Sequence, residues 1–123
     1  MGRDEATLLD IVNAARAVLA FTQGMRQDQF LEDIKTQSAV LYQLIVMGET
    51  VKRLSREWRQ RHPEIPWALI AGMRDHLIHG YDVVDWHEVW ETATRDVPEL
   101  LSKLEPLLPK EGPWEERRSQ SME

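Results

Sequence analysis

The residues best suited to chemistry lie in one stretch, 74–81, which reads Arg-Asp-His-Leu-Ile-His-Gly-Tyr. Arg74 supplies a permanent cation and Tyr81 a phenol, while His76 and His79 can exchange protons near neutral pH. An arginine fork binds two phosphate oxygens at once, and a histidine transfers the proton that a phosphate ester gains or loses during cleavage. These side chains together predict phosphodiester chemistry without a metal ion.

A short helix is expected to position this stretch. Apolar side chains recur at helical spacing over about residues 66–78, a proline suits the first turn, and Gly80 is a natural stop. This places His79 on the last turn, where the negative end of the helix dipole favours its protonated form and Arg74 opposes it. Because the helix stops at Gly80, Tyr81 is expected to turn back toward Arg74.

Other interpretations of these side chains stay open. His76 and His79 are three residues apart, a spacing that can bind a metal, but two histidines without a cysteine or paired carboxylates make a weak site. Glu49 is either a buried polar residue that faces the site or a plain surface glutamate. Tryptophans are more typical of cores and interfaces than of base-stacking surfaces, and Trp67 is assigned to the core.

The hydrophobic pattern predicts an all-α protein without strands. Helices are expected over residues 5–22, 32–61, 66–78 and 84–108, with a polar join at 26–29. Pro98 is expected to kink or break the last of these helices. The predicted architecture is an up-and-down bundle of four main helices, with room for a short extra helical segment.

The length of 123 residues predicts one domain, over residues 1–108. Residues 109–123 are rich in proline, glycine and charge, which predicts a flexible, disordered tail. Hydrophobic residues make up 42% of the chain, enough for one core, and the absence of cysteine excludes disulfides and thiolate chemistry. Apolar runs are much shorter than the ~20 residues that cross a bilayer, so we expect a soluble cytoplasmic protein with no membrane partner.

The net charge of −6 argues against a protein that binds nucleic acid over its whole surface. One segment of the chain, however, has a positive net charge. Between Val51 and His62, a single glutamate accompanies five basic residues, namely Lys52, Arg53, Arg56, Arg59 and Arg61. The plain interpretation is a solvated helix face. The functional interpretation is a phosphate-steering stripe, a row of basic residues close in sequence to Arg74 that attracts the phosphates of a substrate.

The order of several short motifs resembles one protein family. Arg74, His79 and Tyr81 match the signature of HEPN-domain ribonucleases, in which an arginine, a histidine and a tyrosine follow at fixed spacing. A wider set resembles the HepT-like toxin branch of that superfamily, in the same order along residues 4–108: Thr36–Val40, Gly48–Glu49, Ile65–Trp67, Gly72–Asp75 and Ile78–Tyr81.

This resemblance implies a helical homodimer whose two motifs form one composite, metal-independent endoribonuclease site without a cofactor. It implies a toxin paired with a small nucleotidyltransferase antitoxin, which blocks the site by transferring AMP from ATP to Tyr81. Carried over to this chain, Arg74 stabilises the phosphorane, His79 acts as general acid or base, and Asp75 orients neighbouring groups. Apart from the resemblance, the residues themselves suggest supporting or substrate-steering roles for Glu49, His76, Lys52, Arg53 and Arg56.

A dimer also resolves a chemical difficulty of the single chain. Cleavage by the 2′-hydroxyl of RNA needs both a base and an acid, and one His79 supplies only one of them. A two-fold axis near the motif supplies two histidines and pairs the arginines opposite one phosphate. The alternative function is a non-catalytic HEPN module that binds a nucleotide or docks the nucleotidyltransferase, and a third is a structural protein with a metal on His76 and His79.

Overall fold

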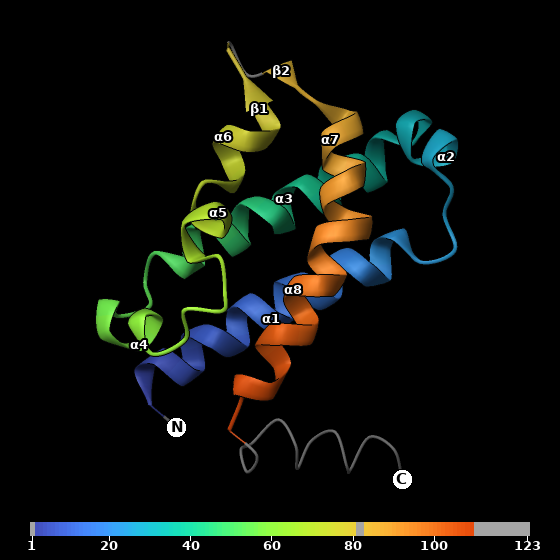
Figure 1. The fold of residues 1–123 in the computed structure, drawn as a ribbon. Helices are drawn as coiled ribbons and strands as arrows, with labels where there is room; N and C mark the ends of the chain where they lie inside the picture. Colours follow the sequence, from blue (N-terminus) through green and yellow to red (C-terminus); the bar gives the residue numbers. More distant parts are fainter. Residues whose placement is uncertain (1, 81–82, 110–123) are drawn as a thin grey trace, which may run out of the picture.

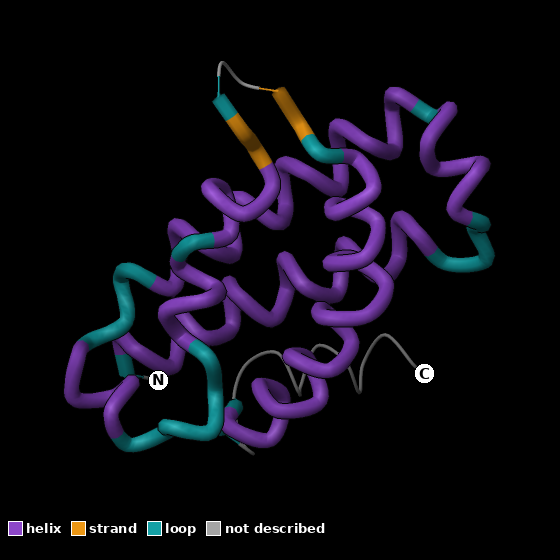
Figure 2. The backbone as a smooth tube through the Cα atoms, turned by 45° about the horizontal axis from the view of Figure 1, so that its top comes forward, coloured by secondary structure: helices purple, strands orange, loops and turns teal. Residues whose placement is uncertain are grey.

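Helix α1 (Arg3–Thr22) lies antiparallel to α3 (Ile34–Val51), and the later helices pack across this pair (Figure 1). The computed structural model describes residues 2–80 and 83–109. The other elements are α2 (Gln27–Glu32), α4 (Arg56–Gln60), α5 (Trp67–Ala71), α6 (Met73–Leu77), β1 (Ile78–His79), β2 (Val83–Val84), α7 (Trp86–Glu91), the π-helical turn η1 (Thr92–Asp96), α8 (Val97–Leu104) and the 3₁₀ turn η2 (Glu105–Leu107). The predicted all-α helical bundle is confirmed (Figure 2).

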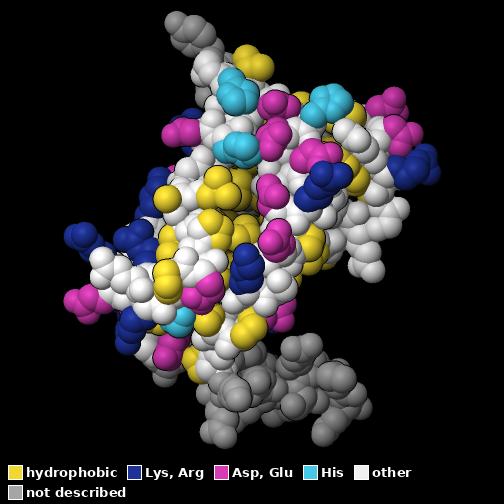
Figure 3. Space-filling view, in the orientation of Figure 1, with side chains coloured by type: hydrophobic (Ala, Val, Ile, Leu, Met, Phe, Trp, Pro, Cys, Tyr) yellow, Lys and Arg dark blue, Asp and Glu magenta, His cyan; other side chains and the backbone are white. Residues whose placement is uncertain are grey.

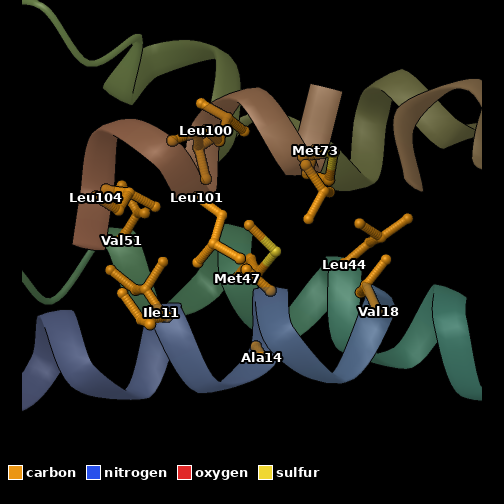
Figure 4. Packing of buried hydrophobic residues seen from close by; sticks show 14 of the residues in the cluster. Ile11, Ala14, Val18, Leu44, Met47, Val51, Met73, Leu100, Leu101 and Leu104 are labelled. Carbon is orange, nitrogen blue, oxygen red and sulfur yellow. The ribbon is translucent and has the colours of Figure 1, made fainter. Parts of the chain in front are cut away.

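The helix predicted over residues 5–22 is confirmed because its periodic apolar residues form one buried face. Ile11 and Val18 of α1 are completely buried, and they meet side chains of α3 and α8 such as Met47 and Leu101 (Figure 4). The assignment of Trp67 to the core is also confirmed. Within the described residues, none of the helices combines the length and apolarity that a membrane crossing needs.

The single helix predicted over residues 32–61 is wrong, and so is the polar join at 26–29. The segment forms α2, which begins at Gln27, then α3 and α4. Asp33 starts a new helix because its carboxylate accepts hydrogen bonds from Thr36, at 3.1 Å from the backbone nitrogen and 2.7 Å from the hydroxyl. Such side-chain acceptors favour a helix start over the continuation of a helix.

The second break, between α3 and α4, depends on a contact with the N-terminal end of α1. Ser55 caps α4 by accepting a hydrogen bond from the backbone nitrogen of Trp58 at 3.1 Å. Asp4 of α1 in turn accepts hydrogen bonds from the Ser55 backbone nitrogen at 2.8 Å and from its hydroxyl at 2.7 Å. These bonds lower the pKa of Asp4. A residue 51 positions away therefore fixes where α4 begins.

The helix predicted over residues 66–78 is divided at Gly72 into α5 and α6, and it ends earlier than predicted. A close approach to α3 sets the position of this pair. A Cβ atom on Gly48 of α3 would lie 2.8 Å from the Ile70 carbonyl oxygen and 3.2 Å from the Met73 Cβ. Only glycine allows α3 and the α5–α6 pair to lie this close.

A two-stranded antiparallel hairpin follows α6, contrary to the expectation of no strands. Ile78 pairs with Val84, and His79 pairs with Val83. Gly80 has φ of +57°, a left-handed conformation that glycine adopts without steric cost. The backbone nitrogen of Asp85 also donates to the Leu77 carbonyl at 2.9 Å, so the hairpin is tied to the end of α6.

The predicted fourth helix is confirmed from residue 86 onward; Val84 belongs to β2 instead, and Asp85 caps α7. The run of helical turns is not broken at Pro98; instead, the π-helical turn η1 directly precedes α8, which carries this proline in its first turn. A proline cannot donate the usual backbone hydrogen bond, and a wider turn removes the clash with the preceding carbonyl. The tail expected over 109–123 lies, apart from Pro109, outside the described residues.

Candidate active site

Arg74 and His79 lie on either side of the end of α6, and both are exposed. The prediction that His79 lies on the last helical turn is wrong, because Ile78 already has an extended backbone with φ of −119° and ψ of 121°. The side chain of His79 is 60% exposed in the short strand β1. The hairpin, and not a helix end, therefore presents the histidine to solvent.

Asp85 is the nearest carboxylate partner of His79 among the described residues, and sequence reasoning missed it. Its Oδ2 lies 3.9 Å from the His79 Nε2. Its Oδ1 caps α7 by accepting a hydrogen bond from the Glu88 backbone nitrogen at 3.1 Å. The signal in the sequence was an aspartate three residues ahead of a glutamate, which is typical of a helix start. This cap holds a negative charge beside the imidazole.

His76 belongs to a different contact. Its Nε2 lies 2.7 Å from the Glu88 Oε1, which joins α6 to α7. Burial, followed by the negative charge of Glu88, raises the pKa of Asp96, while His76 acts in the opposite direction. In the described part of the chain, no group of three or more histidine, aspartate or glutamate side chains is arranged to hold a metal ion.

The predicted cluster is therefore divided by the geometry of α6. Met73 and Leu77 face the core, and the three residues between them are exposed. Each residue turns the helix by about 100°, so Arg74 and His76 point about 200° apart. Asp75, between them, is exposed as well. The structure places His76 toward α7, and the helical rotation between the two residues then directs Arg74 to another side of α6.

The AMP-acceptor residue predicted from the resemblance, Tyr81, lies outside the described residues. The buried alternative for Glu49 is wrong, because its side chain is 58% exposed and its Oε1 lies 3.2 Å from the Lys52 ammonium. Arg53 lies 4.0 Å from the Asp10 carboxylate. Arg56 is exposed on α4. The predicted basic stripe is thus spread over the end of α3 and over α4.

A bundle with an arginine on one short helix and a histidine just past its end has the features of the HEPN class. The chain belongs to the HepT-like ribonuclease family, since the model described as "Ribonuclease HepT-like" matches residues 11–107. The matched range includes both Arg74 and His79.

Several curated relatives cover most of the chain. "Probable ribonuclease HepT" of Thermococcus cleftensis is 42% identical over 81% of this chain and 91% of its own length. "Putative RNase MJ1216" of Methanocaldococcus jannaschii is 38% identical over 85% of this chain and 86% of its own. "Putative RNase TTE0752" of Caldanaerobacter subterraneus is 36% identical over 82% of this chain and 90% of its own. No solved structure matches the chain at a significant level.

Proposed function

We propose that this protein is a metal-independent endoribonuclease that works as a homodimer. The observation that carries the proposal is the exposure of Arg74 and His79 on either side of the end of α6 in a HepT-like chain. A guanidinium stabilises the charge that develops on a phosphorane, and an imidazole exchanges protons at neutral pH. Both groups are open to a polymeric substrate.

The reaction that fits these groups is attack by the 2′-hydroxyl of RNA. His79 removes the hydroxyl proton, and the oxygen forms a bond to the adjacent phosphorus. Arg74 binds the oxygens of the phosphorane. The bond to the 5′ oxygen then breaks, and the partner subunit's His79 donates a proton to that oxygen. The products are a 2′,3′-cyclic phosphate and a 5′-hydroxyl.

The outer face of α3 supports the dimer. We define this face by Ile34, Lys35, Tyr42, Ile45 and Glu49; its apolar members include Ile34, 76% exposed, and Tyr42, 65% exposed. Lys35, Tyr42 and Glu49 are seven residues apart and share one side of the helix. An antiparallel pair centred on Tyr42 would set each lysine opposite the partner's glutamate, so the face is complementary to itself.

The proposed interface also lies on the helix that positions α6. The Met73 Cβ lies beside Gly48, one residue from the end of the outer face of α3. Arg74 follows Met73 directly in the chain. Tyr42→Glu should therefore convert the dimer to a monomer and reduce cleavage, whereas Phe21→Glu, on the exposed side of α1, should change neither. Light scattering gives the mass, and a Tyr42→Glu protein that remains a dimer contradicts this interface.

The proposed biological role is that of a toxin held inactive by a nucleotidyltransferase antitoxin. The partner would transfer AMP to the Tyr81 hydroxyl, releasing pyrophosphate from ATP. This part of the proposal is supported by the family resemblance. Intact-mass measurement of protein co-expressed with the nucleotidyltransferase should show an AMP-sized increase that is absent in Tyr81→Phe; an unmodified wild-type protein contradicts it.

Cleavage of end-labelled RNA by the purified protein, in the presence of a chelator, tests the central proposal. The wild type should give fragments that end in cyclic phosphate, and Arg74→Ala and His79→Ala should not. His87→Ala is the matched control, because His87 is an exposed histidine on α7 whose contact is with Gln27. RNA or nucleotide binding without cleavage by the wild type would favour the non-catalytic module instead.

A further inference from the structure

We call the surface formed by residues 52–61 the α4 end. Its basic residues differ in whether they form ion pairs. Lys52 and Arg53 each lie beside a carboxylate, that of Glu49 and that of Asp10. Arg56 and Arg59 have no ion pair with any acidic residue in the described part of the chain. Cations whose charge is not offset by a near carboxylate are the ones available to an anionic ligand.

These two arginines line a groove beside α5. The other lining residues are Gln60 on α4 and Trp67 and Ala68 on α5. Arg56, Arg59 and Gln60 are related by three and four positions, so they lie on one side of α4. Figure 3 shows Lys and Arg side chains gathered over this end of the molecule, while Asp and Glu side chains follow α7 and α8. The groove therefore lies in a region of positive charge.

The groove is held in shape by an indole hydrogen bond. The Trp67 Nε1 donates to the Arg59 carbonyl at 3.1 Å and to the His62 carbonyl at 2.9 Å, which ties the end of α4 to α5. Trp58 packs edge-to-face against Trp67 with ring centroids 5.8 Å apart. A rigid groove loses little entropy when a ligand binds.

The side chain of Arg59 gives a second indication that the groove binds a ligand. Its Nε is buried and has no hydrogen-bond partner among the described residues, and an unsatisfied buried donor is energetically costly. A phosphate in the groove would offer the guanidinium a two-point contact, and it would remove that cost once the side chain turned to expose Nε. Trp67 is only 8% exposed, so its ring is closed to base stacking and the groove would read the backbone of a nucleic acid.

We infer that this groove binds the phosphodiester backbone of the RNA substrate beside the cleavage site; the inference rests on the proposed function. Ala68 on the groove wall is six residues from Arg74, which limits their separation to about 20 Å for an extended chain. A strand of a few nucleotides spans that distance. Arg56 and Arg59 each neutralise a phosphate, and Gln60 can donate to a sugar hydroxyl or accept a hydrogen bond from it.

The test measures binding of a fluorescein-labelled single-stranded RNA over a range of salt concentrations. It uses the full chain carrying His79→Ala, with a chelator, so that the RNA stays intact. Each phosphate contact adds roughly 0.7 to the slope of log affinity against log salt for a single strand. The double variant Arg56→Gln/Arg59→Gln should lower the slope by about 1.4, and Arg56→Gln alone, at an exposed position, by about 0.7.

Arg95→Gln/Lys103→Gln is the matched control, because it removes the same charge from η1 and α8, where the two residues pair with Glu91 and Glu99. This control should leave the slope unchanged. The inference is overturned if both double variants lower the slope equally, if neither does, or if the RNA does not bind. Cleavage by the protein with His79 intact is measured separately, so an active enzyme with an unchanged slope refutes the groove alone, and a lowered slope without cleavage refutes the proposed reaction alone.

Discussion

Two carboxyl groups, that of Asp4 beside α4 and that of Asp96 between α7 and α8, have pKa values shifted in opposite directions. At the α4 end, Asp4 accepts two hydrogen bonds from Ser55, and its pKa is lowered. On η1, between α7 and α8, Asp96 is exposed, but desolvation followed by the charge of Glu88 raises its pKa. Hydrogen bonds from Ser55 are the main cause of the first shift, and burial is the main cause of the second. The two carboxylates therefore differ in their local contacts, whereas the surfaces around them differ in composition, with Lys and Arg over α4 and Asp and Glu along α7 and α8 (Figure 3).

The largest expected effect separates the two histidines at the end of α6. His79→Ala should reduce RNA cleavage by about 10²–10⁴-fold, because it removes the proposed proton carrier. His76→Ala should leave the rate within the same order of magnitude, since His76 is occupied by Glu88 on the acidic face. Single-turnover cleavage assays measure both. An equal loss of cleavage in the two variants would show that the His76–Glu88 pair belongs to the active site.

A second prediction concerns Gly48, on which the position of the α5–α6 pair depends. Gly48→Ala should destabilise the protein by about 1–3 kcal/mol, because the added Cβ would lie 2.8 Å from the Ile70 carbonyl oxygen. Cleavage should fall as well, since α6 carries Arg74. Urea unfolding followed by circular dichroism measures the stability. Ser38→Ala, at an exposed position of the same helix, is the control, and a stable, fully active Gly48→Ala protein would show that the contact is dispensable.

The third prediction tests the charge at the α4 end. Asp4→Ala should cost about 1 kcal/mol at neutral pH, since it removes the acceptor of both Ser55 hydrogen bonds. A lowered folded-state pKa means that this stability is present above the unfolded-state value near 3.8 and is lost as the pH falls through the folded-state value. The difference in melting temperature between the two proteins should therefore shrink on acidification. A difference independent of pH would argue for packing alone.

The smallest expected effect has the opposite sign. Asp96→Asn should stabilise the protein at neutral pH by less than about 0.5 kcal/mol, because it removes a charge that burial and Glu88 disfavour. A raised pKa means that the contribution of the Asp96 carboxyl to stability is fully present below the unfolded-state value near 3.8 and is lost as the pH rises through the folded-state value. The advantage of the variant should thus vanish in acid. Thermal melts from acid to neutral pH measure it, and a destabilised variant would contradict the electrostatic account.

Elements with a local cause were predictable from the sequence. The periodic apolar residues of α1 need only a core to face, so its helix was predicted within two residues of its observed start. Pro98 lacks a backbone donor wherever it lies, and the departure from α-helical geometry appears directly before it. The ordered motifs that include Arg74 and His79 are also a property of the sequence alone, and together they indicated the family.

Features that depend on distant contacts were not predictable. The helix predicted over residues 32–61 ends early because Asp4 holds Ser55, and only the packing of α1 against α3 brings these residues together. The pairing of His79 with Asp85 requires the hairpin, and the division of His76 from Arg74 requires the orientation of α6. The sequence determined which chemical groups this protein carries. The tertiary structure decided which of them meet, because contacts between residues far apart in the chain outweigh local helical preference.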